Sequence, residues 1–375
     1  MLIITKENAM DTILNSVAVH PSEFIKDSLN YFKMSQEELA SRLGMTPKYI
    51  SNIMKRKSGI STETAIKLEN VFGTPASFWI AAQGRYDEFQ NRIEEERTIL
   101  AEEINIFNAY NLNTLFNKLV KLGFLSNENN IVLKIKSLLS FFEISRLSLL
   151  DKIIDKQLHG MAYTPKQEIN KYDFIAWLNC GRKKMRDASL EPFDMDKFKD
   201  SVRYIRDLSS NRLDEVWDII AKKYASSGVF IVLTPCIGKS SVFGYTEWLN
   251  GTPIIHLSNR GALDYAWHSL FHESYHVIQN KRLKVFIDSV GKPTNSDDDD
   301  EKNAHNFASR ILLKDEDVYN YFNKMDFKNF DFAVQTHMVK QFAKLKNIIP
   351  AIVVSRLQRL GIIGYKTHLN SFKKK

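Results

Sequence analysis

The chain contains little cysteine, no long apolar run and no leader of the secretory type, and each absence excludes a class of protein. Its two cysteines, Cys180 and Cys236, form neither a disulfide framework nor a Cys-x-x-Cys pair, which favours reduced thiols in a cytoplasmic protein. No uninterrupted apolar segment approaches the roughly 18 residues that span a bilayer, so we expect no membrane partner. The opening text MLIITKENAMDTILNS has no basic stretch followed by an apolar run, so we expect no secretory signal.

The residues that are present are typical of folded domains. Hydrophobic residues make up 44% of the 375 positions and include 24 Phe and 14 Tyr, which favours well-filled cores over disorder. A chain of this length exceeds one comfortable core, so we expect two or three domains. The formal net charge of +8 permits a polyanionic partner such as nucleic acid without requiring one.

Three regions of the chain differ in their patterns. Residues 1–90 hold short amphipathic segments separated by glycines, whereas residues 91–160 are charged, proline-free text that predicts a helical connector. Within residues 161–375 the strand-like segments GVFIVLTP, SVFGYTEWL and TPIIHLS appear, the last two joined by an Asn-Gly turn signal. We therefore predict an α+β fold that is predominantly α, with an N-terminal helical bundle, a helical connector and a C-terminal domain containing a small β-sheet.

The segment QEELASRLGMTPKYISNIMK, residues 36–55, has the spacing of a helix-turn-helix motif. Such a motif needs a small residue where its helices cross, a glycine in the left-handed turn and an apolar anchor on the second helix. Ala40, Gly44 and Ile50 occupy these positions. The sequence therefore predicts two short helices that cross closely around residues 40–50.

Helix-start signals support this motif. Ser35 followed by Glu38 has the pattern of a capping box for the first helix. Thr46 before Pro47 supplies an N-cap and a proline at the first position of the second helix. Both helices are therefore expected to begin where the motif requires.

The outer face of the second helix carries side chains suited to DNA. The apolar residues turn inward, which leaves polar groups outside to meet base edges and phosphates, namely Thr46, Lys48, Tyr49, Ser51, Asn52 and Lys55. Gln36, at the start of the first helix, is placed to hold a phosphate. The alternative is a small helical bundle that has no DNA partner and whose basic residues are merely solvated.

Flanking text identifies the region more narrowly. The motif is preceded by His20-Pro21, followed by LENVFGTPASFW and closed by Tyr86-Asp87. With these features, residues 18–90 closely resemble the HigA-type antidote branch of the Xre-like helix-turn-helix proteins. The resemblance implies operator DNA as a partner, binding as a homodimer, and autorepression beside a toxin gene.

The stretch HSLFHESYHVIQN, residues 268–280, has the spacing of a metal site. His272 and His276 would leave one face of a helix a turn apart, which suits Zn²⁺, and Glu273 would lie beside the metal, able to activate water. The downstream text EKNAHNFASRILL offers Glu301 or His305 as a third ligand, and spacing alone does not choose between them. The alternative is a set of polar side chains on a helix surface without any metal.

A second resemblance covers this half of the chain. The texts FHESYH and E-x-x-A-H-x-F-A resemble the ImmA/IrrE-type zinc peptidases, which usually have Asn where this chain has His305. Spanning residues 161–370, the resemblance implies a zincin-like domain with His272, His276 and Glu301 as zinc ligands. It also implies that Glu273 is the general base and that His305 lies behind the ligands.

Together the two resemblances imply a transcriptional regulator or antitoxin whose zinc metallo-endopeptidase domain cuts a repressor, a partner protein or itself. The alternative is a non-proteolytic antitoxin or ligand-sensing repressor with an inert zincin scaffold, whose partner is a cognate toxin or a small ligand. The intact Glu273 favours the enzyme, because a binding scaffold needs no general base. His268 is a candidate for transition-state support, and the acidic run Asp297–Asp300 is expected to be a solvated loop.

Overall fold

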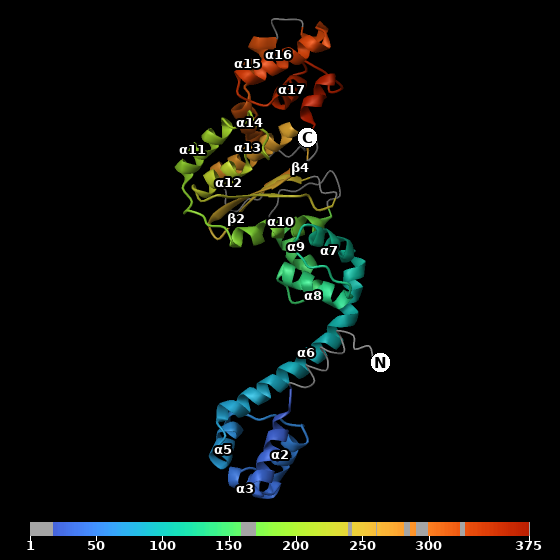
Figure 1. The fold of residues 1–375 in the computed structure, drawn as a ribbon, viewed down its shortest axis with the longest axis vertical. Coiled ribbons are helices and arrows are strands. Elements are labelled where there is room, and N and C mark those ends of the chain that lie inside the picture. The colour runs from blue at the N-terminus through green and yellow to red at the C-terminus, as the bar shows by residue number, and fades with distance from the viewer. Residues whose placement is uncertain are drawn as a thin grey trace. The chain divides into compact units, whose positions relative to one another are not determined.

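The computed structural model describes residues 18–158, 170–238, 242–259, 261–280, 286–289, 299–322 and 327–374. It divides into two compact units, Met1–Glu103 and Ile104–Lys375 (Figure 1). The predicted fold class is confirmed, because helices dominate the described residues and their strands form a small sheet. Residues 1–16, where we expect no secretory signal, lie outside the described residues. None of the helices in the described ranges combines the length and apolarity that crossing a bilayer requires.

The first unit is a bundle of short helices around a small apolar core. Leu39, Ile50, Leu68 and Trp79 are each at most 1% exposed, so every helix contributes its apolar face to the same centre. The helices are α2 (Pro21–Phe32), α3 (Gln36–Leu43), α4 (Pro47–Met54), α5 (Thr62–Phe72) and the first part of α6 (Ala76–Ala109), which continues into the second unit.

Local signals start and stop the helices of the motif. The Ser35 hydroxyl accepts from the backbone N–H of Glu38 at 3.1 Å, and the Thr46 hydroxyl accepts from that of Tyr49 at 3.3 Å. The expected capping box is formed in one direction, because the Glu38 carboxylate accepts from Arg42 at 2.6 Å. Gly44 ends α3 at φ 63°, the left-handed conformation that the tight turn into α4 requires.

The second unit contains a mixed sheet of strand order β1-β3-β2-β4. β1 (Phe230–Thr234) is parallel to β3 (Thr252–Ser258), whereas β2 (Val242–Leu249) is antiparallel to both β3 and the short β4 (Phe286–Ser289). Asn250 and Gly251 join β2 to β3 with φ values of 51° and 85°, as the predicted two-residue hairpin turn requires. β4 was not predicted from the sequence.

Helices cover both faces of this sheet, with α10 on one face and α13 on the other (Figure 1). One apolar core contains the buried residues on the α10 side of the sheet. A second contains the buried residues on the α13 side and those of the C-terminal helices. The helices are α7 (Leu112–Lys121), α8 (Ile131–Phe142), α9 (Leu150–Leu158), α10 (Lys171–Arg186), α11 (Met195–Arg206), α12 (Trp217–Ala225), α13 (Leu263–Gln279), α14 (Asp299–Leu312), α15 (Asp315–Phe322), α16 (Phe332–Leu345) and α17 (Pro350–Arg359). The described residues of this unit also contain three short 3₁₀ turns, η1 (Leu147–Leu149), η2 (Phe327–Asn329) and η3 (His368–Lys373).

Candidate metal centre and nucleic-acid interface

Helix α13 carries the candidate metal ligands in the interior of the second unit. It packs on β2 and β3 through one side and on α14 through another, so its polar residues are buried along with its apolar ones. His272 and Glu273 are 0% exposed and His276 is 1% exposed. Polar groups at such depth need partners or a bound ion, so a solvated helix-surface cluster is excluded.

The metal-binding atoms of three residues meet where α13 contacts α14. Nε2 of His272 lies 3.1 Å from Nε2 of His276, and Glu301 places one carboxylate oxygen 3.2 Å from the first and the other 3.3 Å from the second. A tetrahedral zinc ion with bonds of about 2.0–2.1 Å holds its ligand atoms about 3.3 Å apart. The spacing of these donors therefore fits a metal ion of zinc's size, and the three residues could hold one.

The ionisation states of the triad suit a cation. Burial alone would raise the pKa of Glu301, but its close contacts with the rings of His272 and His276 lower it well below its ordinary value. Burial lowers the pKa of His276, although Glu301 opposes this effect. The site is thus an ionised carboxylate beside neutral imidazole, which are the forms that bind zinc.

A hydrogen-bonded chain behind the triad orients His276. With its proton on Nδ1, the ring donates to Oε1 of Gln279 at 3.2 Å, and Nε2 of Gln279 donates to Asp300 at 3.1 Å. This arrangement turns the Nε2 lone pair of His276 toward the triad, as such outer contacts commonly do in metal sites. Asp300 corrects an expectation, because it is 8% exposed and belongs to α14 rather than to a solvated loop, while Asp297 and Asp298 lie outside the described residues.

Glu273 is held against strand β2 beside the triad. The Thr246 hydroxyl donates to its Oε2 at 2.6 Å and lies 3.2 Å from its backbone carbonyl oxygen. Gly244 leaves room for this carboxylate, because a Cβ at residue 244 would fall 2.6–2.9 Å from the Glu273 side chain. Glu273 therefore has a fixed carboxylate on the helical turn that carries His272, and it does not belong to the group of donor residues.

His305 contributes its ring to the surroundings of the triad. The centroid of its ring lies 4.4 Å from that of His272 and 5.4 Å from that of His268. The group of residues that could hold a metal includes Glu301 and does not include His305. The choice between Glu301 and His305, which spacing left open, thus falls on Glu301. His268 stacks beside both rings, with its centroid 6.1 Å from that of His272.

In the first unit, the residues expected to read DNA lie along one side of the motif. Gln36, Thr46, Lys48 and Lys55 are exposed, and Tyr49, Ser51 and Asn52 are half-buried. The Tyr49 hydroxyl lies 3.1 Å from that of Thr64, so its ring is tied to α5 and is less free than its neighbours. Thr46 uses its hydroxyl as the helix cap, although the residue as a whole is exposed.

Comparison with known proteins identifies this motif. Residues 31–79 match the family model described as "Helix-turn-helix". Two curated relatives come from Dichelobacter nodosus: virulence-associated protein I is 34% identical over 71 residues, and virulence-associated protein A' is 36% identical over 69 residues. These alignments span 19% and 18% of this chain and 66% and 60% of the relatives. The first unit therefore contains a helix-turn-helix domain.

Solved structures of antitoxins are similar to about a fifth of this chain. A HigA-family addiction-module antidote from Coxiella burnetii is 29% identical, covering 23% of this chain and 94% of that chain with a TM-score of 0.21. Pseudomonas aeruginosa antitoxin HigA, solved with the higBA promoter, is 30% identical, covering 22% of this chain and 90% of that chain with a TM-score of 0.21.

Sequence reasoning missed the residues that support the triad. Thr246, Gln279 and Asp300 carry no motif, because their partners are set by packing between elements. Gly244 did give a signal, since a glycine inside a strand often marks the close approach of another group.

Proposed function

We propose that this chain is a DNA-binding transcriptional regulator of the antitoxin type that also contains a zinc-dependent metallo-endopeptidase. The observation that carries the proposal is the buried triad of His272, His276 and Glu301 with Glu273 fixed beside it. In this proposal residues 1–90 read DNA, residues 91–160 connect, and residues 161–375 form a zincin-like peptidase domain of the ImmA/IrrE type.

Operator DNA is the proposed partner of the first unit. The helix-turn-helix match over residues 31–79 supports it, together with the polar face that α4 presents beside exposed Lys48 and Lys55. Gln36 would hold a phosphate, and Asn52 would reach a base edge in the major groove. Binding as a homodimer would let two copies of α4 address two half-sites.

The second unit is proposed to hydrolyse a peptide bond in a repressor, a partner or this chain itself. Zinc bound by the triad would supply Lewis acidity for that hydrolysis. Glu273 takes a proton from the attacking water and passes it to the leaving amine, and it needs a fixed carboxylate for both transfers. Thr246 provides that fixation through its hydrogen bond to Oε2, and burial keeps bulk water from competing.

Three variants test the metal and the chemistry separately. Purified wild type should retain about one zinc ion per chain, and His272→Ala should largely abolish it because a neutral nitrogen ligand is lost. Glu301→Gln should weaken zinc retention, since it removes the charged ligand. Glu273→Gln should keep the zinc and the fold while cleavage falls by about 10²–10⁴-fold, the usual effect of losing a general base.

The readouts are elemental analysis of freshly purified protein, immunoblots of chain length, and a reporter for the promoter. If cleavage controls repression, the Glu273→Gln protein should bind its operator and fail to release it under inducing conditions. Wild type that holds no metal would refute the peptidase proposal. Normal induction by Glu273→Gln, with no fragment in either strain, would mean instead that the unit senses a ligand or docks a toxin without cutting.

A further inference from the structure

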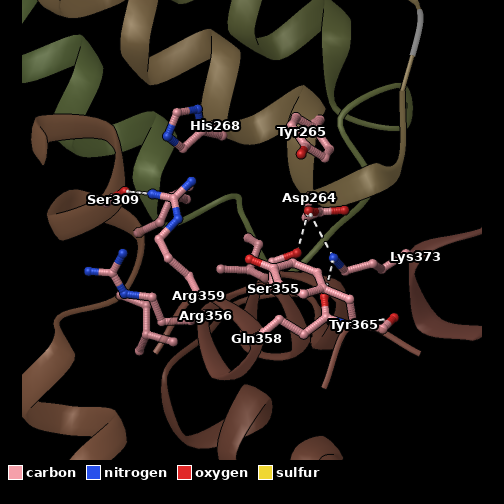
Figure 2. A pocket seen from close by; sticks show the side chains of 13 residues that line it. Asp264, Tyr265, His268, Ser309, Ser355, Arg356, Gln358, Arg359, Tyr365 and Lys373 are labelled. Carbon is pink, nitrogen blue, oxygen red and sulfur yellow. Dashed lines mark hydrogen bonds and ion pairs between the residues drawn. The ribbon is translucent and has the colours of Figure 1, made fainter. Parts of the chain in front are cut away.

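A cavity of about 130 Å³ lies in the C-terminal part of the second unit, between α13, α14, α17 and η3 (Figure 2). None of the triad residues lines it, although His268 does and stacks beside His272. Since each water of liquid occupies about 30 Å³, the space corresponds to about four waters. It is large enough for the charged core of a small metabolite.

Two polar atoms of residues that line this cavity have neither a hydrogen bond nor an ion pair among the described residues. They are Oδ1 of Asp264, whose residue is 7% exposed, and Nε2 of His268, one helical turn further along α13; Nε of Arg356 also lacks a hydrogen bond but is ion-paired with Asp315. Buried polar atoms are rarely left unsatisfied in folded proteins. Their partners are therefore expected to come from whatever occupies the cavity.

Charged side chains lie on both sides of the cavity, Asp264 with Lys373 on one side and Arg356 with Arg359 on the other (Figure 2). On one side, Asp264 accepts a hydrogen bond from Ser355 and lies 3.6 Å from Nζ of Lys373, which leaves its other oxygen available. On the other side, the Arg359 guanidinium donates to Ser309 at 2.7 Å. No carboxylate within the described ranges pairs with Arg359, whereas its neighbour Arg356 is paired with Asp315 at 2.5 Å.

His268 lies on the same side of the cavity as Arg359 (Figure 2). Its Nε2 is buried without a hydrogen-bond partner among the described residues, so the ring offers one hydrogen bond beside the guanidinium. Leu312, Leu313 and Ile352 add apolar surface to the lining, beside the polar groups of Gln358 and Tyr365.

We propose that this cavity binds a free L-amino acid with an apolar side chain, its carboxylate on Arg359 and His268 and its ammonium on Asp264. A simple anion such as phosphate would satisfy Arg359 but would leave the Asp264 oxygen without a donor. A simple amine would satisfy Asp264 but would leave Arg359 without an anion. A zwitterion with a short apolar side chain satisfies both sides and the apolar lining, so the chemistry of the wall selects it.

This inference goes beyond the proposed function and needs neither DNA nor a metal. Its test is isothermal titration calorimetry on the full chain, with L-leucine as the first probe and the other common L-amino acids after it. Leucinamide lacks the carboxylate, 4-methylpentanoate lacks the ammonium, and inorganic phosphate is an anion alone. Wild type should bind at least one amino acid, and roughly tenfold or more tightly than the analogues that lack one charge.

Substitutions locate the binding. Arg359→Gln and Asp264→Asn should each weaken binding roughly tenfold or more, because each removes one charged partner. Arg310→Gln is the matched control, since Arg310 is exposed on α14 and does not line the cavity, and it should bind as wild type does. Circular dichroism establishes whether each variant is folded. If Asp264→Asn does not fold, Arg359→Gln alone is sufficient for the test.

Three results would overturn the proposal. The first is wild type that binds none of the common amino acids. The second is equal affinity for the amino acid, 4-methylpentanoate and phosphate, which would make the cavity an anion site. The third is a folded Arg359→Gln protein whose affinity equals that of the Arg310→Gln control.

Discussion

Glu247 is paired inside the second unit, on the face of the sheet opposite to Glu273, and its replacement by Gln tests how the sheet is held. Its carboxylate accepts from Arg182 of α10 through two hydrogen bonds, Nε to Oε1 at 2.8 Å and Nη2 to Oε2 at 2.6 Å. Nε2 of His256, on β3, lies 3.0 Å from the same Oε1. The side chains are 9%, 19% and 0% exposed, respectively, so neither charge is screened by bulk water.

The expected loss can be estimated in two ways. Breaking a buried ion pair by removing one partner costs about 3–5 kcal/mol, since the buried Arg182 guanidinium would lose the carboxylate that accepts two of its hydrogen bonds. Burial alone would raise the pKa of Glu247, but Arg182 and His256 lower it from 4.5 to about 2. At about 1.4 kcal/mol for each pKa unit, this difference corresponds to about 3 kcal/mol of stability. We therefore expect Glu247→Gln to lower the free energy of unfolding by about 3 kcal/mol at pH 7.

The same pKa fixes the pH dependence. Because the folded-state pKa lies below the ordinary value, the contribution of Glu247 is fully present above about pH 4.5. It is lost as the pH falls toward about 2, where the folded protein also binds the proton. The stability gap between wild type and Glu247→Gln should therefore narrow between these pH values.

Urea unfolding followed by tryptophan fluorescence measures this gap at each pH. The matched control is Glu143→Gln, because Glu143 pairs with Arg186 on the same helix as Arg182, but with side chains 48% and 60% exposed. Exposed pairs contribute about 0–1 kcal/mol, so the control should unfold almost as wild type does. Equal losses in the two variants, or a gap that does not change with pH, would refute the reasoning.

Features that depend on a few neighbouring residues could be predicted from the sequence. The caps at Ser35 and Thr46, the left-handed Gly44 and the hairpin at Asn250-Gly251 all follow from local backbone chemistry. One local feature differs from the prediction: the Glu38 side chain does not return a hydrogen bond to Ser35, as a full capping box requires. Glu38 has a competing partner in Arg42 one turn away on the exposed face, and a charged partner wins over a backbone N–H.

The choice of the third donor could not be made from spacing. Glu301 and His305 are one turn apart on α14, so both can face α13, and only the way that the two helices pack decides which one reaches the donors. The outcome is physically sensible, since Glu301 adds a negative charge beside the two histidine rings. His305 instead fills the space between the rings of His268 and His272.

The supporting residues were beyond sequence reasoning for the same reason. The acidic run before α14 looked solvated because like charges usually avoid burial, yet Asp300 is drawn in by the amide of Gln279. Thr246 reaches Glu273 only because β2 lies under α13. Each contact joins segments far apart in the chain, and periodicity within one segment carries no information about it.

Two further predictions address the proposed sites. Asn52→Ala should cost about 1–3 kcal/mol at one base pair and relax specificity there, as measured by operator footprinting at moderate salt; protection equal to that of wild type would mean that the reading face is wrongly assigned. Gly244→Ala tests the position of Glu273 without altering a ligand. The added Cβ would lie 2.6 Å from Oε1 of Glu273, so the carboxylate must move, and Thr246 and the surrounding burial resist that movement. Displacing a catalytic group by about 1 Å costs about 10²-fold in rate, so cleavage should fall while elemental analysis shows zinc retained. Gly364→Ala is the control, because a Cβ at residue 364 meets nothing within 4 Å. If Gly244→Ala cleaves as fast as Gly364→Ala, the carboxylate of Glu273 does not act from the position that the structure gives it.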